Sequence, residues 1–430
     1  MVVVGALILL ILFLGAGMPV GIALGVAGVA GLYFTGGVQA VTSIMATVPY
    51  RTTASYTLTT VPMFILMAQF IAAGGIVEEV FAAARRWLER MPGGLAIASI
   101  LASAGVAAMS GSSTASAATM AAVTVPEMKR HGYTDAVATG VVTVAGTLAI
   151  MIPPSIGLVL YGIITGNSVG KLLMAGLIPG LMTASIYCIG IVVWGKVRPG
   201  VMPAPTRIFS WNDRWRSLKP VWAFMLLTFV VLGSIYSGLA TPTEASAVGA
   251  FGAWIIPLAR GKMPWRAFWV AVTKTVQITT MIFTIMIGAM IFGYFLTYTQ
   301  STQNLILFVG NLAMPPWQIL AVILIIILLM GCLMDQVAIL LITLPLIYPL
   351  VTSLGYDPIW FGIICIKLGE IGLVTPPVGM NAYVVSASTG VPLETVFRGV
   401  GVMLLFEIIS AVLLLAFPLL STWLPSKMFQ

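Results

Sequence analysis

The sequence predicts an all-α polytopic membrane protein built from two inverted-topology repeats, each with a re-entrant helical hairpin and a proline-broken transmembrane helix. Composition supports a membrane protein, since 60% of the 430 residues are hydrophobic and only 7% are charged, against about 25% charged in soluble domains. Apolar stretches of the roughly 20 residues that a helical crossing needs recur along the chain. A repeat with a constant offset of 223 positions predicts the duplication.

The repeat centres on two proline pairs, Pro153-Pro154 and Pro376-Pro377, which lie 223 positions apart. The same offset relates Pro19 to Pro242, Pro126 to Pro349, Gly132-Tyr133 to Gly355-Tyr356, and Gly176 to Gly399. Proline has no amide hydrogen, so each pair interrupts the hydrogen bonding of a helix. Irregular backbone at membrane depth is tolerated only where it is buried or lines a cavity. Two matched breaks therefore predict a duplicated binding centre.

The first repeat is predicted over residues 1–197. Its expected crossings are Val2–Gly17, Pro19–Phe34, Leu58–Ala73, Ala136–Gly166 (broken at the prolines, about residues 136–166) and Lys171–Trp194. Residues 94–126 contain the run MSGSSTAS, which is too polar for a lipid-facing helix centre, so a hairpin with its tip at Ser110–Thr114 is expected. The first crossing lacks the basic start and cleavage site of a signal peptide, so it is expected to be retained.

A linker over residues 198–218 precedes the second repeat, predicted over residues 219–430. Its expected crossings are Val221–Ser237, Thr243–Leu258, Lys274–Tyr298, Pro358–Thr389 (broken) and Leu393–Leu424. A second hairpin is expected over residues 316–350, with its tip in the run GCLMDQ. Five crossings in a repeat are an odd number, so the second copy should enter the membrane upside down.

Charge placement agrees with the inversion. In the ten-crossing arrangement the basic clusters fall on one side, whereas the opposing loops over residues 36–48 and 300–313 carry no charge. These clusters are Arg85, Arg86 and Arg90; Lys129 and Arg130; Lys196, Arg198, Arg207, Arg214, Arg216 and Lys219; and Arg260, Lys262 and Arg266. The positive-inside bias therefore predicts a cytoplasmic linker and an extracytoplasmic N-terminus, and it explains the net charge of +8 without nucleic acid.

The segment Gly75–Met91 is amphipathic, with charged and apolar residues at helical spacing. It is predicted either to lie along the cytoplasmic surface of the membrane or to form a short solvated loop helix.

Helix breaks and hairpin tips offer two kinds of ligand. Carbonyls at the end of a half-helix have lost their intrahelical partners and can bind a cation. Amide groups at the start of a half-helix favour an anion. An inverted pair of breaks therefore predicts two cation sites that flank one anion site, although protons are an alternative to Na+.

Each motif also has a structural interpretation. Small residues such as those of SGSST pack helices together in membranes, and a proline break can be a simple kink. Asp335 is an acid in an apolar run, which costs about 2.5–3.5 kcal/mol on insertion scales, so we expect it to be functional. Lys367 and Glu370, three positions apart, predict a local ion pair. Glu407 is expected to be a packing or interface group.

The motifs around the breaks resemble the DctM-type large membrane subunit of the tripartite ATP-independent periplasmic (TRAP) transporters. The resemblance covers essentially the whole chain and keeps the order of the motifs. They are GSSTASAATMAAVTVPEMKRHGY, GTLAIMIPPSIGLVLYG, AGLIPG, GCLMDQ and TPPVGMNAYVVSASTG.

This resemblance implies a secondary transporter of the bacterial inner membrane with an elevator mechanism. The family imports organic acids, commonly C4-dicarboxylates or sialic acid, and is driven by a sodium gradient. Its partners are a small four-span membrane subunit and a soluble periplasmic binding protein. Because the chain starts at the first span of the large subunit, the small subunit is expected to be a separate chain.

The resemblance also implies sites, residue by residue. A first Na+ site would involve Ser110, Ser113, Ala149, Ile152 and Pro154. A second Na+ site would involve Gly331, Gly372, Thr375 and Val378. The carboxylate substrate would contact Ser112, Ser113, Thr114, Asp335, Gln336, Pro377 and Asn381. Ala149 departs from the family, where glycine is frequent, but a carbonyl ligand survives this change.

Two other classes of function are alternatives. An ion-coupled anion permease that works without a binding protein has a related inverted-repeat plan. An intramembrane enzyme is disfavoured because a serine protease needs a partnered base, and the single histidine, His131, lies in a basic loop. An aspartyl protease needs two intramembrane acids on facing helices, and only Asp335 has a suitable setting. We therefore expect a transporter and no enzymatic activity.

Overall fold

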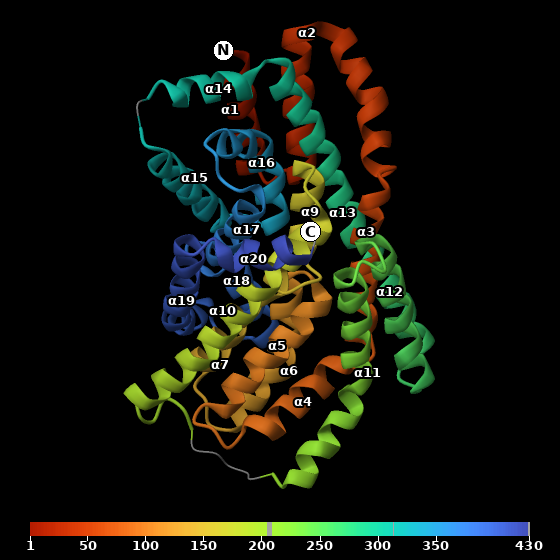
Figure 1. Ribbon diagram of the computed structural model, residues 1–430, viewed down its shortest axis with the longest axis vertical. Coiled ribbons are helices and arrows are strands. Elements are labelled where there is room, and N and C mark those ends of the chain that lie inside the picture. The colour runs from red at the N-terminus through yellow and green to blue at the C-terminus, as the bar shows by residue number, and fades with distance from the viewer. Residues whose placement is uncertain (204–208, 313, 429–430) are drawn as a thin grey trace.

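The computed structural model describes residues 1–203, 209–312 and 314–428, and every regular element among them is a helix (Figure 1). Seven helices are long and apolar enough to cross a membrane, or eight if the bent pair Asp135–Met151 and Ile156–Thr165 counts as one span. The prediction of an all-α polytopic membrane protein is confirmed.

The first half of the chain contains α1 (Val2–Gly15), α2 (Val20–Thr53), a 3₁₀ turn (Tyr56–Thr59), α3 (Thr60–Ala73), α4 (Ile76–Leu88), α5 (Gly94–Ser110), α6 (Ser113–Arg130), α7 (Asp135–Ala145), α8 (Leu148–Met151), α9 (Ile156–Thr165) and α10 (Val169–Val197). The second half contains α11 (Trp211–Tyr236), α12 (Pro242–Ala259), α13 (Trp265–Tyr298), α14 (Ser301–Gly310), α15 (Pro316–Gly331), α16 (Gln336–Ser353), α17 (Pro358–Val374), α18 (Met380–Thr389), α19 (Leu393–Ala416) and α20 (Leu419–Met428).

The offset of 223 positions also relates the helices of the first half to those of the second. Moving the bounds of α6 by 223 positions gives those of α16, and α9 and α10 fall within one or a few residues of α18 and α19. The equivalent helices α4 and α14 lie toward opposite ends of the long axis in Figure 1, as an inverted repeat requires. The packing is likewise reciprocal, because α6 packs against α18 and α16 packs against α9.

Four sequence expectations differ from the structure. The region expected as a loop over residues 36–48 is helical, since α2 continues to Thr53 and turns at Gly37, whose φ of 68° suits glycine. The loop expected over residues 300–313 contains α14. The first crossing is a helix of only 14 residues, short of the roughly 20 that a crossing needs. The last crossing ends at Ala416, because Pro418 cannot continue the helix, and α20 follows.

The predicted linker over residues 198–218 is shorter in the structure, because α11 begins at Trp211. The segment 204–208 of this linker, which includes Arg207, and Ala313 of the second predicted loop lie outside the described residues.

The helices form two packed groups. We call α1–α3 with α11–α13 the span group, and α5–α10 with α15–α20 the hairpin group. In the span group the backbones of α2 and α13 touch, and a Cβ added to Gly21 would lie 2.6 Å from the carbonyl oxygen of Thr284. In the hairpin group α7 packs on α19 and α15 on α17. The two hairpins face the span group, which places their tips at the contact between the groups.

The amphipathic segment forms α4, which buries one face rather than lying free as a solvated helix. Val77, Val80 and Phe81 are buried against α5 and α11. On the polar face Arg85 pairs with Glu89 and with Glu127 of α6. The helix therefore joins the first hairpin to the span group at the end of the molecule where α11 begins (Figure 1).

Candidate functional site

Both proline pairs interrupt helices, and both contain a cis peptide bond. In the first half, residues 135–151 and 156–165 are bent by 41° at the break. Because Pro153 and Pro154 lack amide hydrogens, the carbonyls of Ala149 and Ile150 have no donor four residues ahead. In the second half α17 ends at Val374 and α18 starts at Met380. Each break therefore presents backbone oxygens that a continuous helix would use.

Each hairpin tip is joined to the break of its own repeat by a backbone hydrogen bond. The N–H of Ile156 donates to the carbonyl of Gly111 at 3.4 Å. The N–H of Gly379 donates to the carbonyl of Cys332, also at 3.4 Å. The donors Ile156 and Gly379 are 223 positions apart and the acceptors Gly111 and Cys332 are 221 apart, so the contact follows the repeat to within two residues. The structure thus brings together each predicted tip and break.

The residues predicted for the first cation site surround the first tip and break. The Ser110 and Ser113 hydroxyls are buried and have no hydrogen-bond partner among the described residues. Ala149, Ile152 and Pro154 are also buried. This region therefore combines free carbonyls with orphan hydroxyls, which are the hard oxygen ligands of a small cation.

At the second predicted cation site the backbones are in close contact, but the residues are more exposed than those of the first site. The backbones of Gly331 and Gly372 touch, since a Cβ on Gly372 would lie 2.5 Å from the Cα of Gly331. Val378 is 37% exposed, and Pro376 and Pro377 are exposed, whereas their counterparts in the first half are buried. The backbone is thus similar at the two breaks, but the second break is more exposed than the first.

The two hairpins also match at the start of their second helices. Ser112 caps α6, with its hydroxyl accepting from the Ala115 N–H at 3.5 Å. Asp335, its counterpart at the 223 offset, caps α16 by accepting from the Val337 N–H at 3.1 Å. The positive end of α16 is met by its own carboxylate, whereas that of α6 meets a neutral hydroxyl. The α6 end is therefore the better position for an external anion.

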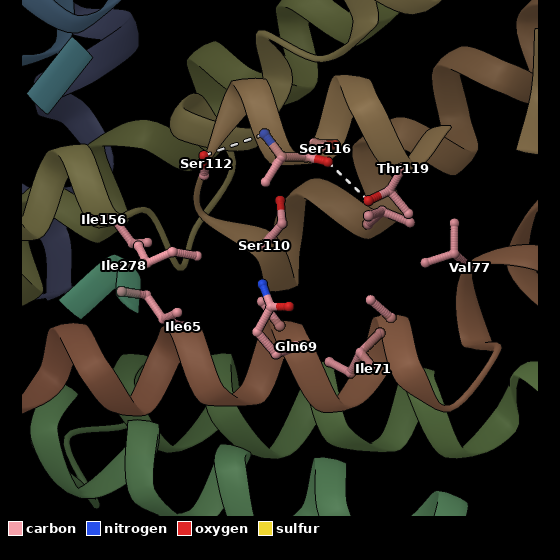
Figure 2. Close-up of a pocket in the computed structure, with 14 residues that line it drawn as sticks. Ile65, Gln69, Ile71, Val77, Ser110, Ser112, Ser116, Thr119, Ile156 and Ile278 are labelled. Atoms are coloured by element: carbon pink, nitrogen blue, oxygen red, sulfur yellow. Dashed lines mark hydrogen bonds between the residues drawn. The ribbon is translucent and has the colours of Figure 1, made fainter. Parts of the chain in front are cut away.

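Two cavities lie between the hairpin group and the span group. The smaller, of about 70 Å³, contains Ser110, Ser112, Ser116 and Thr119 on one side. Figure 2 shows Gln69 of α3 facing Ser110 across this cavity. Its other lining residues are almost all apolar.

The larger cavity, of about 720 Å³, joins the two hairpins. Thr114 of α6 and Asp335 of the second tip line it, opposite Thr280 and Thr284 of α13. Ser112 and Thr114, whose hydroxyls are 3.2 Å apart, connect the two cavities. Among the described residues, neither lining contains a lysine, arginine or histidine. Recognition of an anion here must therefore use helix N-termini and hydroxyls.

Four predicted substrate residues line neither cavity: Ser113, Gln336, Pro377 and Asn381. Gln336 and Asn381 are fully buried, and neither side-chain amide has a hydrogen-bond partner among the described residues. Pro377 is exposed. The structure thus brings Ser112, Ser113, Thr114 and Asp335 to the tips and leaves Gln336, Asn381 and Pro377 at their margin.

Comparison with known proteins assigns the family. The family model of the tripartite ATP-independent periplasmic transporter DctM component matches residues 7–420. The chain belongs to the DctM family. It is 37% identical over 378 residues to a C4-dicarboxylate TRAP transporter large permease protein of Pseudomonas aeruginosa, covering 88% of each chain. It is 31% identical to a sialic acid TRAP transporter large permease protein of Vibrio cholerae, covering 86% of each.

A solved structure shares the fold of this DctM chain. The YdaH transporter of Alcanivorax borkumensis matches with a TM-score of 0.64 and 13% identity, over 89% of both chains. The relatives are named as permease proteins, which confirms the expectation of a transporter rather than an enzyme. Family membership together with the apolar helices indicates a multi-pass protein of the inner membrane.

The predicted ion pair of Lys367 with Glu370 is wrong in this DctM chain. Lys367 instead pairs with Glu407 of α19, and both side chains are buried. Glu407 also accepts from the Thr147 hydroxyl at 2.9 Å, beside the first break. Glu370 is left with no hydrogen-bond partner among the described residues. Spacing along α17 suggested the local pair, and the α17–α19 contact overrides it.

The sequence did not reveal which residues the span group contributes to the site. Gln69 of α3 and Thr280 and Thr284 of α13 line the cavities. Thr280 and Thr284 are one helical turn apart in an apolar segment, a spacing that places both on one face. His131, expected as a solvated loop residue, is half-buried at the end of α6, with Nε2 2.8 Å from Arg85.

Proposed function

We propose that this chain is the large membrane subunit of a sodium-coupled importer of an organic acid. The substrate is a carboxylate such as a C4-dicarboxylate or sialic acid, delivered by a soluble periplasmic binding protein. The observation that carries the proposal is the duplicated pairing of a hairpin tip with a proline break. Both pairs lie at the contact between the hairpin group and the span group.

Sodium is the proposed coupling ion at two sites. The first uses the carbonyls of Ala149, Ile152 and Pro154 with the Ser110 and Ser113 hydroxyls, which have no hydrogen-bond partner in the described part of the chain. The second uses the backbone at Gly331, Gly372, Thr375 and Val378. No cluster of three or more His, Cys, Asp or Glu side chains occurs within the described part of the chain. Sites of carbonyls and hydroxyls suit a monovalent cation better than a transition metal.

The substrate carboxylate is proposed to bind at the N-terminus of α6, where Ser112 and Thr114 add hydroxyl donors. Since no basic side chain from the described part of the chain lines the cavities, the anion would rely on backbone N–H groups and on the bound sodium ions for its countercharge. In this arrangement the anion would bind poorly without the cations, and this dependence would couple its transport to theirs.

Transport is proposed to follow an elevator mechanism, in which the hairpin group moves against the span group. The cavities between the two groups support this division. A separate four-span small subunit and the lipid bilayer are the proposed neighbours of the outer surface. Trp215, Trp222 and Phe229 of α11 are each more than half exposed there. The N-terminus is proposed to be periplasmic and the segment between the repeats cytoplasmic.

Replacing Asp335 by alanine tests the site. We expect uptake to fall at least tenfold while the protein remains in the membrane, because the cap of α16 and the carboxylate of the larger cavity are both lost. Asp357→Ala is a matched control, since Asp357 caps α17 with bonds of 2.9 and 2.8 Å but lies away from the tips. It should keep most of its uptake. Equal losses in the two variants would reduce Asp335 to a helix cap.

Bulky replacements at the first tip extend this test. Ser112→Trp and Ser113→Trp should abolish uptake, since Ser113 is 1% exposed and Ser112 lines the smaller cavity. Uptake is measured with equal amounts of membrane-inserted protein. Unchanged sodium-dependent uptake in these variants and in Asp335→Ala would remove the proposed site.

A further inference from the structure

Glu370 is a buried acid that the arrangement described so far does not use. Its side chain is 1% exposed, and neither carboxylate oxygen has a hydrogen-bond partner among the described residues. Lys367, one turn earlier on α17, is already paired with Glu407. Leaving an ionised carboxylate unpaired in a protein interior is costly, so the group needs a countercharge or a proton.

The surroundings of Glu370 come from both repeats. The Ser113 hydroxyl of the first tip faces the carboxyl, although it forms no hydrogen bond within 3.5 Å. Ser113 is itself 1% exposed and without a partner. On the other side, the Gln336 amide lies against Gly369, so that a Cβ there would meet its oxygen at 2.1 Å. Three orphan polar side chains therefore gather where the two hairpin tips approach α17.

The charges around this point do not balance. The titratable groups that act on Glu370 are Asp335 from α16, Glu407 from α19 and Lys367 from its own helix, and Tyr187 of α10 lies close to the same cluster. The single lysine is held by Glu407. Asp335 and Glu370 are left without a basic partner, so a mobile cation is the simplest source of the missing positive charge.

We propose that the Glu370 carboxylate binds a monovalent cation together with the Ser113 hydroxyl, so that the second repeat supplies a charged ligand to the cation site at the first hairpin tip. The inference rests on the proposed function only in naming Na+ as the ion. A carboxylate and a hydroxyl are hard oxygen ligands, and one carboxylate compensates a single charge. The bound ion would also tie the first hairpin to α17.

The test is sodium binding to the purified chain, measured as thermal stabilisation in detergent while NaCl replaces choline chloride at constant ionic strength. In Glu370→Gln the sodium concentration for half-maximal stabilisation should rise at least tenfold. Glutamine has the shape of the protonated acid, so a carboxyl that is merely protonated and packed is insensitive to this change. Glu394→Gln, at an exposed acid of α19, should titrate like the unchanged chain.

A second variant covers the case in which Glu370→Gln does not fold. Ser113→Ala removes the partner hydroxyl and should weaken sodium binding in the same direction. A sodium titration of Glu370→Gln that matches the unchanged chain overturns this inference and leaves the proposed sodium coupling standing. A titration of Ser113→Ala that matches it overturns the inference and also removes the Ser113 hydroxyl from the proposed first site. An unchanged chain that shows no response to sodium at all contradicts the proposed coupling itself.

Discussion

Lys367→Met is expected to lower the free energy of unfolding by about 3–5 kcal/mol, the usual cost of removing one partner of a buried salt bridge. Lys367 and Glu407 are 3% and 0% exposed, respectively. Without the lysine, the Glu407 carboxylate would be buried with only hydroxyl partners. The effect should therefore be a large fraction of the about 5–15 kcal/mol by which a typical domain is stable.

The position of this pair explains why it matters beyond its own energy. Glu407 accepts from Thr147 at 2.9 Å, and Thr147 lies 3.1 Å from the Tyr187 hydroxyl. Ser410 contributes a further bond of 3.3 Å. The network thus joins α17, α19 and α10 to Thr147, which precedes α8 and the first break. Loss of the lysine should loosen the break as well as the core.

Thermal unfolding in detergent, followed by the loss of helical signal, measures the effect. Lys367→Met/Glu407→Leu should recover most of the loss, because replacing both members of a buried pair with apolar side chains is often nearly neutral. Arg398→Ala is the control, since its pair with Glu394 is exposed, and it should change stability by less than about 1 kcal/mol. If the double variant is no more stable than Lys367→Met, then Lys367 and Glu407 are not energetically coupled.

Gly372→Ala is expected to be the most damaging single methyl addition in the site. The new Cβ would lie 2.5 Å from the Cα of Gly331 and 2.6 Å from the carbonyl oxygen of Leu328. Both contacts are to backbone, so α15 must move away from α17. Overpacking of this kind typically costs about 1–3 kcal/mol, and it displaces the second tip from its break.

Sodium-dependent uptake and thermal unfolding should both report this change, with uptake lowered at least tenfold. Gly401→Ala is the matched control, because beyond the neighbouring backbone of its own helix α19 no described atom lies within 4 Å of its added Cβ. It should be neutral or stabilising by up to about 1 kcal/mol, the helix propensity gain of alanine over glycine. Full uptake in Gly372→Ala would mean that the close contact of Gly331 and Gly372 is dispensable.

The repeat, the breaks and the tips could be predicted because local chemistry determines them. Pro153-Pro154 and Pro376-Pro377 must end a helix wherever they occur, and the polar run at Ser110–Thr114 cannot face lipid. The offset of 223 then paired Ser112 with Asp335, and the structure gives both the same capping role. These features depend on a few neighbouring residues.

What the sequence did not reveal depends on contacts between distant segments. The spacing of Lys367 and Glu370 favours a local pair, but α19 brings Glu407 to the lysine instead. Gln69 and Thr280 reach the cavities only because the span group packs against the tips. The extension of α2 past Gly37 was missed because glycine and polar residues there resemble a loop. No local pattern contains this information.

Sodium-driven uptake in proteoliposomes is the most direct test of the central claim. The large subunit, its small subunit and the cognate binding protein are reconstituted, and uptake of the acid that the binding protein carries is followed under an inward sodium gradient. We predict uptake that needs both the gradient and the binding protein and is lost in Asp335→Ala. Equal uptake without the binding protein would instead support a self-sufficient anion permease, and uptake indifferent to sodium would contradict the account.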